Sequence, residues 1–250
     1  MNATQPLSAP PLDLLNAASL FLDFDGTVVE LVARHDAVVV EARLHELLAT
    51  LLAKLDGRLA IVSGRPAADL AQLFGGGATF LISGSHGLEF HWPDGRIDAP
   101  DDAPLPAGAL ARLHALAARH AGVVVEPKPF GAALHFRLAP GAEDECRMLV
   151  AAIADETGFA VQTGKMVVEL KHPAADKGAA VRRLMREPIM TASRPIFVGD
   201  DATDESAFAA AQALGGAGIL VGPERPTAAS YRLNSVDDTI RWLHAAKAAL

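Results

Sequence analysis

The sequence has 250 residues, of which 50% are hydrophobic and 21% are charged, so the chain can bury a sizeable core and is not intrinsically disordered. Its formal net charge of -8 argues against a general nucleic-acid binder, but not against an anionic substrate that binds through a divalent cation. A single cysteine, Cys146, excludes an intrachain disulfide, and we expect it to be an inert core residue. Without a membrane-length apolar run or a secretion signal, we expect a soluble cytoplasmic protein with no membrane partner.

Short apolar runs alternate with helical patterns along much of the chain. Residues 1–17 are rich in proline and polar residues, and we expect them to form a flexible arm. The predicted strands, each ending in small or polar residues, are 20–24, 59–63, 80–83, 195–200 and 218–222. The predicted helices are 41–55, one that opens at Pro66, 177–185 and 204–214. This alternation predicts an α/β fold with a doubly wound, parallel, Rossmann-like sheet.

The middle of the chain has a different pattern. Two predicted helices, 107–120 and 143–157, are each followed by two short strands around a turn. Since hairpins imply an antiparallel sheet, we predict a small α+β cap domain over 104–174. This domain would be inserted into a core formed by residues 18–103 and 175–250. The segments 94–106 and 172–176 are the predicted hinges.

Reactive side chains follow the predicted core strands. Ligands of open α/β sheets bind beyond the carboxyl ends of the strands. Ser63, with the amides of Gly64 and Arg65 behind it, suits an anion at a helix start. Carboxylate oxygens are the ligands that Mg²⁺ prefers, and a cluster of them needs a counter-ion. Five such groups follow the first and fourth core strands: Asp23, Asp25, Asp200, Asp201 and Asp204.

Four of these motifs, in chain order, resemble those of the haloacid-dehalogenase-like phosphatase superfamily. They are Asp23-x-Asp25-Gly26-Thr27, Ser63, Lys177 and Gly199-Asp200-Asp201. Longer strings resemble the trehalose-6-phosphate phosphatase family: 84–87, 126–128, 133–137, 168–171, 177–178 and 199–205. The resemblance covers about residues 19–245, and the inserted domain would match the cap of that family. Two mild departures, Asp176 and Ala202, do not touch the chemistry.

The resemblance implies Mg²⁺-dependent hydrolysis of trehalose 6-phosphate to trehalose and phosphate. Asp23 would be the nucleophile that forms an aspartyl-phosphate, and Asp25 the general acid and then the general base. Ser63 and Lys177 would bind the phosphoryl group. Mg²⁺ would be held by Asp23, the backbone carbonyl of Asp25, and Asp200. Two further carboxylates would orient Lys177 and metal-bound water rather than touch the metal: Asp201 and Asp204.

Sugar selection would come from the inserted domain. The candidates there are Glu126, Lys128 and Glu169, with His135 and Arg137 behind them on one strand face. On the core, the further candidates for substrate contact are Gly64, Arg65 and His86.

Simpler explanations remain open for each group. Ser63 could be a plain helix cap and Lys177 a surface lysine, while Arg65 and His86 could be structural. The charged residues of the insert could occupy an exposed sheet face. The acidic residues Asp204 and Glu205 suit the first turn of a helix in any protein.

Three other functions compete with the trehalose phosphatase interpretation. A phosphatase of the same superfamily could act on another sugar phosphate, such as sucrose phosphate. A second alternative is another class of reaction, dehalogenation or phosphoryl transfer within a mutase, although Asp25 argues against dehalogenation. A catalytically inactive domain could regulate a synthase, although every residue needed for turnover is present. The partner expected is a small sugar phosphate and not a nucleic acid, with a functional link to a trehalose-6-phosphate synthase left open.

Overall fold

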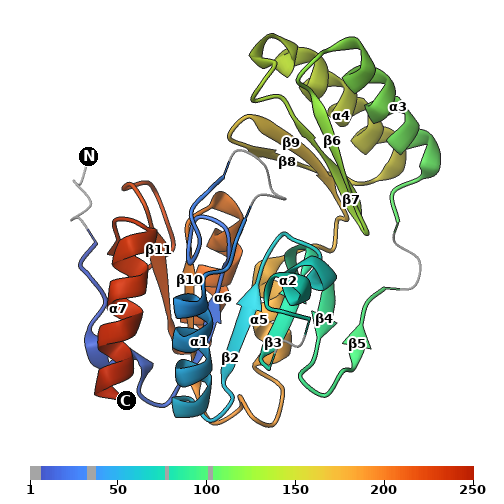
Figure 1. The fold of residues 1–250 in the computed structure, drawn as a ribbon. Coiled ribbons are helices and arrows are strands. Elements are labelled where there is room, and N and C mark those ends of the chain that lie inside the picture. The colour runs from blue at the N-terminus through green and yellow to red at the C-terminus, as the bar shows by residue number, and fades with distance from the viewer. Residues whose placement is uncertain (1–6, 33–37, 77–78, 101–103) are drawn as a thin grey trace. The chain divides into compact units, whose positions relative to one another are not determined.

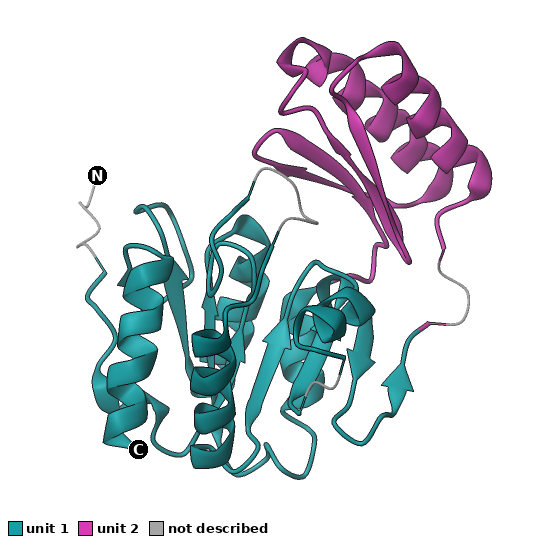
Figure 2. Ribbon diagram, viewed as in Figure 1, with its two compact units in different colours: residues 1–99, 176–250 teal, residues 100–175 magenta. Residues whose placement is uncertain are grey.

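The computed structural model describes residues 7–32, 38–76, 79–100 and 104–250. The chain forms two compact units (Figure 2). Unit 1 contains residues 1–99 and 176–250, and unit 2 contains residues 100–175. The segment predicted as an insertion, 104–174, lies within unit 2.

Unit 1 is built on a sheet with strand order β12-β11-β10-β1-β2-β3-β4-β5 (Figure 1). The strands from β12 to β3 are parallel, and β3, β4 and β5 pair antiparallel at one edge. The bounds are β1 Ala18–Leu22, β2 Leu59–Val62, β3 Leu81–Gly84, β4 Glu89–His91, β5 Ile97–Asp98, β10 Arg194–Gly199, β11 Ala217–Val221 and β12 Tyr231–Leu233. The predicted parallel α/β core is therefore confirmed.

Helices cover both faces of this sheet, which explains the continuous apolar runs of its strands. On β1, Leu20 and Leu22 belong to the apolar cluster that contains residues of α1, α2 and α7, whereas Phe21 belongs to the cluster of α5 and α6. The helices of the first face are α1 Ala42–Lys54, α2 Ala67–Leu73 and α7 Val236–Ala249. Those of the second face are α5 Lys177–Leu184 and α6 Glu205–Ala213 (Figure 1). Unit 1 also contains the short 3-10 helices η1 Leu12–Leu15, η3 Ser85–Gly87 and η5 Ala202–Asp204.

Parts of unit 1 differ from the sequence-based expectation. Of the arm predicted over residues 1–17, residues 1–6 lie outside the described residues. Leu14 and Leu15 of η1 are buried in the core, because their apolar side chains pack against the α7 side of the sheet. The predicted hinge at 94–106 begins inside the β4–β5 hairpin, whose edge is held by a hydrogen bond from the Trp92 indole to Asp98.

Unit 2 is a four-stranded antiparallel sheet with strand order β6-β7-β9-β8. The strands are β6 Val124–Lys128, β7 Gly131–His135, β8 Ala160–Gly164 and β9 Val167–Lys171. One sheet face packs on the helices α3 Ala107–Arg119 and α4 Glu143–Thr157, and η4 Pro140–Ala142 precedes α4. Cys146 is fully buried in this core, as expected of an inert core residue. No helix in the described parts of either unit is long and apolar enough to cross a bilayer.

Candidate active site

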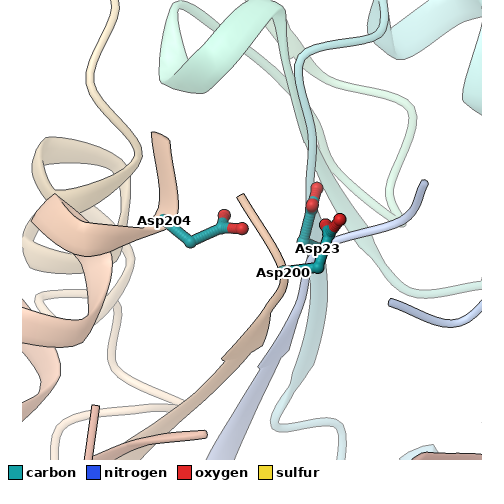
Figure 3. A group of neighbouring side chains, drawn as sticks. All are labelled: Asp23, Asp200 and Asp204. Carbon is teal, nitrogen blue, oxygen red and sulfur yellow. The ribbon is translucent and has the colours of Figure 1, made fainter. Parts of the chain in front are cut away.

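Two acidic side chains follow neighbouring parallel strands of unit 1. Leu22 at the end of β1 pairs in register with Val198 of β10, and the amide of Asp23 donates a 2.9 Å hydrogen bond to the Val198 carbonyl. Asp23 and Asp200 therefore lie side by side, as the parallel topology predicts. The Asp204 carboxyl, at the start of α6, is directed toward them (Figure 3). Carboxyl oxygens of the three residues lie within 4.8 Å of one another.

The turn after β1 leaves room for this cluster only because it contains glycine. Gly26 has a φ of +78°, and a Cβ atom there would come within 2.2 Å of Asp200 Oδ2. The next residue, Thr27, is fully buried, and its hydroxyl donates a 3.4 Å hydrogen bond to Asp200 Oδ1. The Asp-Gly-Thr string thus both turns the chain and orients a carboxyl group from another strand.

Lys177 supplies the cation at this site from the first turn of α5. The Asp176 side chain caps that helix by accepting hydrogen bonds from the amides of Gly178 and Ala179. The Lys177 ammonium lies 2.8 Å from Asp23 Oδ1 and 2.7 Å from Asp204 Oδ1, and its side chain is buried. Burial alone would lower the pKa of Lys177, but the charges of Asp204 and Asp23 outweigh burial and raise that pKa above its ordinary value.

The carboxyl groups carry more negative charge than one lysine balances. Burial, followed by the charge of Asp204, raises the pKa of Asp23 well above its ordinary value, against the opposing charge of Lys177. The same two causes raise the pKa of Asp200 to about 7. A closely spaced, oxygen-only donor set with uncompensated charge suits a hard divalent cation. The residues present therefore fit Mg²⁺.

Asp25 does not join the three-carboxyl cluster; it pairs with Arg65. The guanidinium donates two hydrogen bonds to the carboxyl group, of 2.6 Å to Oδ2 and 2.8 Å to Oδ1. Arg65 in turn follows Ser63 in the loop between β2 and α2, and its amide donates a 3.2 Å hydrogen bond to the Ser63 hydroxyl. Ser63 is buried, so this hydroxyl is oriented by its own loop.

The remaining candidates of unit 1 differ in their surroundings. His86 is buried in the short turn between β3 and β4, where its ring lies against Gly64. Asp201 is exposed and caps η5 by accepting a hydrogen bond from the Ala202 amide, so its side chain has a structural partner. Asp204 contacts Lys177 directly, whereas Glu205 binds Arg225, Thr227 and the Ala228 amide.

Four candidates of unit 2 share one face of its sheet: Glu126, Lys128, His135 and Glu169. Glu126 and Glu169 both pair in register with Ala133 of β7, so they lie in one row across the sheet. Lys128 forms a 2.8 Å ion pair with Glu169, and His135 Nε2 lies 2.7 Å from Glu126 Oε2. The opposite face carries the apolar residues that pack on α3 and α4. This grouping is what strand alternation predicts.

Arg137 was expected beside His135 on one strand face, but β7 ends at His135. Arg137 lies two residues beyond the strand end, in an exposed turn. The charged row described above therefore does not continue to it.

Two side chains that sequence reasoning did not single out contact the site loops. The Arg225 guanidinium donates a 2.9 Å hydrogen bond to the carbonyl of Asp201, beside the acidic cluster. Glu89 accepts hydrogen bonds from Ser85 and Ala67, which flank the Ser63 and His86 segments. Neither Arg225 nor Glu89 is part of a recognisable sequence motif, so their contacts with these loops could be found only in the folded structure.

Comparison with known proteins gives one consistent result. A family model described as trehalose-phosphatase matches residues 21–237. A "probable trehalose-phosphate phosphatase" of Sinorhizobium fredii is 41% identical over 248 residues, covering 98% of this chain and 92% of the relative. The trehalose-6-phosphate phosphatase of Escherichia coli is 36% identical over 251 residues, covering 99% and 92%.

A solved structure gives the same fold. The C-terminal domain of the Candida albicans trehalose-6-phosphate phosphatase superposes with a TM-score of 0.84 at 23% identity, covering 99% of each chain. The resemblance expected from the sequence motifs is thus confirmed, and the chain belongs to the trehalose-phosphatase family.

Proposed function

We propose that the chain hydrolyses trehalose 6-phosphate to trehalose and inorganic phosphate in a Mg²⁺-dependent reaction. The observation that carries this proposal is the packing of Asp23 and Asp200 beside Lys177 in a chain of the trehalose-phosphatase family. A carboxyl nucleophile, a metal-binding carboxyl group and a fixed cation are the parts that phosphoryl transfer needs. The related activity on another sugar phosphate, such as sucrose phosphate, is the alternative that substrate comparison decides.

In the first step Asp23 attacks phosphorus through one carboxyl oxygen, and the bond between phosphorus and the sugar oxygen breaks. Asp25 gives the leaving sugar oxygen its proton. In the second step Asp25 removes a proton from water, and the resulting nucleophile releases phosphate from Asp23. Because the Arg65 guanidinium occupies both Asp25 oxygens, Asp25 exchanges this partner for the ester oxygen when substrate enters.

Lys177 and Ser63 bind the oxygens of the transferring phosphoryl group. Lys177 starts from contacts with Asp23 and Asp204, so Asp204 holds the ammonium in place when Asp23 turns to phosphorus. Mg²⁺ would be held by Asp23, the Asp25 carbonyl and Asp200, where it would offset the repulsion between the anionic nucleophile and the anionic ester. Asp201 acts on the loop backbone, through its cap of η5.

The polar sheet face of unit 2 is the proposed site for the sugar hydroxyls. Glu126, Lys128 and Glu169 offer both donors and acceptors in one small area, and His135 adjoins Glu126. Buried polar groups that hydrogen-bond a sugar reject ligands that lack the matching hydroxyls, because the groups would be left unpaired. Arg137 is the weakest member of this proposed set, since its strand ends before it.

The test is phosphate release from trehalose 6-phosphate, glucose 6-phosphate and sucrose 6-phosphate, each with Mg²⁺ and with a chelator. We expect rapid release from the trehalose ester with Mg²⁺ and loss of activity with the chelator. Similar kcat/KM values for all three esters would refute the proposed substrate. Full activity with the chelator would refute the proposed cofactor. A cytoplasmic location and a link to a synthase stay predictions from the sequence.

A further inference from the structure

The turn between β3 and β4 has an unfavourable backbone conformation. Ser85, His86 and Gly87 all lie in the left-handed region, with φ values of 49°, 56° and 97°. Only glycine adopts such values readily, and other residues held there cost about 1–3 kcal/mol each. Ser85 and His86 therefore need surrounding contacts to keep this conformation.

Two backbone hydrogen bonds join this turn to the loop that follows β2. The Ser85 amide donates to the Arg65 carbonyl at 2.8 Å, and the His86 amide donates to the Ser63 carbonyl at 2.9 Å. The His86 ring then lies so close to Gly64 that a Cβ atom on Gly64 would approach its Cε1 atom within 2.5 Å. The turn and the Ser63–Arg65 loop are thus held together, and a shift of one moves the other.

A buried carboxyl group connects the same two segments from behind. Glu89, at the start of β4, is 6% exposed, and its Oε1 atom accepts a 2.6 Å hydrogen bond from the Ser85 hydroxyl. The same oxygen accepts a 3.0 Å hydrogen bond from the amide of Ala67, the first residue of α2. The residue before Ala67 is Pro66, whose side chain cannot cap the helix. Glu89 therefore caps the start of α2 from strand β4.

We propose that Glu89 is a positioning residue for the reaction, which acts by fixing the Ser63–Arg65 loop and the His86 turn relative to each other. Ser63 is the proposed phosphoryl ligand, and Arg65 holds the proposed acid, Asp25. Within the described residues, the side-chain hydrogen bonds of Glu89 come from Ser85 and Ala67, and its other oxygen, Oε2, lies 4.0 Å from His91 Nε2. The inference rests on the proposed function for its consequence in turnover, but the loop contacts that it invokes exist without substrate.

The experiment compares four variants with the unmodified protein. Glu89→Ala removes both hydrogen bonds, and Ser85→Ala removes only one of them. Glu89→Gln keeps an oxygen that accepts both. Ser235→Ala is the matched control, because it removes a helix cap of similar value, about 1 kcal/mol, at the start of α7.

The first measurement is steady-state phosphate release from trehalose 6-phosphate with Mg²⁺. We expect Glu89→Ala to lower kcat by about 10- to 100-fold, because a misplacement near 1 Å can cost that much. Ser85→Ala should lower kcat by a few fold, and Glu89→Gln and Ser235→Ala should keep kcat within about threefold of the unmodified protein. A kcat for Glu89→Ala equal to that of Ser235→Ala would overturn the proposal.

The second measurement needs no activity, so it separates failure of this inference from failure of the proposed function. Amide hydrogen exchange is followed at Ala67, Ser85 and His86, with Leu20 in the central sheet as the reference. We expect Glu89→Ala to speed exchange at the first three amides and leave Leu20 protected. If the unmodified protein releases no phosphate from any sugar ester, the proposed function is refuted. The amide exchange rates then decide by themselves whether Glu89 holds the two loops together. Unchanged exchange at Ala67 and Ser85 would overturn the positioning role.

Discussion

Raising the pH should destabilise the metal-free protein through Asp200. The folded-state pKa of Asp200 is about 7, against an ordinary value of 3.8, because the carboxyl group is buried near Asp204. A folded-state pKa above the unfolded one gives a stabilising contribution that is complete below pH 3.8 and is lost as pH rises toward 7. At roughly 1.4 kcal/mol per pH unit, this difference corresponds to at most about 4 kcal/mol.

The assay is thermal unfolding of chelator-treated protein between pH 5 and pH 8. Because the assay starts at pH 5, it samples about two pH units of this difference, or at most about 3 kcal/mol. For a chain of this length, 1 kcal/mol shifts Tm by about 2–4 °C, so the upper bound for the fall in Tm is about 6–12 °C. Asp200→Asn should reduce this fall, since asparagine does not titrate, and the part that remains belongs to Asp23, whose pKa is also raised by burial and the charge of Asp204. Asp201→Asn is the matched control, because it removes the same charge from an exposed neighbour whose effect on the pKa of Asp200 is smaller than those of burial and Asp204, and it should keep most of the fall.

The same thermal unfolding experiment can be repeated with Mg²⁺ added to the protein. A cation that binds only the folded state stabilises it, so at pH 8 Mg²⁺ should raise the Tm of the unmodified protein more than that of Asp200→Asn. Equal pH dependence of Tm in the unmodified protein and in Asp200→Asn would show that this carboxyl group is not the source of the destabilisation. The electrostatic reasoning for the metal site would then be refuted.

Asp23→Asn should abolish phosphate release while the circular dichroism spectrum stays unchanged, and full activity in this variant would remove Asp23 from the nucleophile role. In a single turnover, Asp25→Asn should slow release of the sugar from trehalose 6-phosphate by about 10²–10⁴-fold but slow release of p-nitrophenol from p-nitrophenyl phosphate much less, because that leaving group needs no proton; equal losses in these two single-turnover rates would contradict the acid role. Lys128→Ala should raise KM for trehalose 6-phosphate without changing hydrolysis of p-nitrophenyl phosphate, whereas Lys165→Ala, in the exposed β8–β9 turn, should change neither. An unchanged KM in Lys128→Ala would exclude the lysine from sugar binding.

The core of the fold could be predicted because strands buried on both faces leave continuous apolar runs. The run at 195–200 became β10, and its parallel pairing with β1 brought Asp200 to Asp23, as predicted. The edge strand β5 has two residues and leaves no such pattern, so it could not be predicted. The apolar side chains Leu14 and Leu15 were overlooked because the prolines around them suggested a loose segment.

The residues of the candidate site also fall into two groups, those whose position a sequence pattern predicts and those whose position it does not. Strand alternation was enough to group Glu126 with Lys128, whereas Lys177 was assigned through the family resemblance, since a single lysine at a helix start has no pattern of its own. The pairing of Asp25 with Arg65 joins residues 40 positions apart, and no periodicity encodes it. Such contacts depend on how loops at one sheet edge pack, which only three-dimensional structure gives.

The chain returns from unit 2 to unit 1 at Asp176, whose side chain caps α5 one residue before Lys177. The contacts that position the Lys177 ammonium group therefore all belong to unit 1. They do not depend on the length or composition of unit 2, which precedes Asp176 in the chain. The unit proposed to bind the sugar could therefore be exchanged between related proteins at this junction while Lys177 keeps its contacts with Asp23 and Asp204. This junction is therefore a place where the proposed sugar-binding unit could change in evolution without moving Lys177.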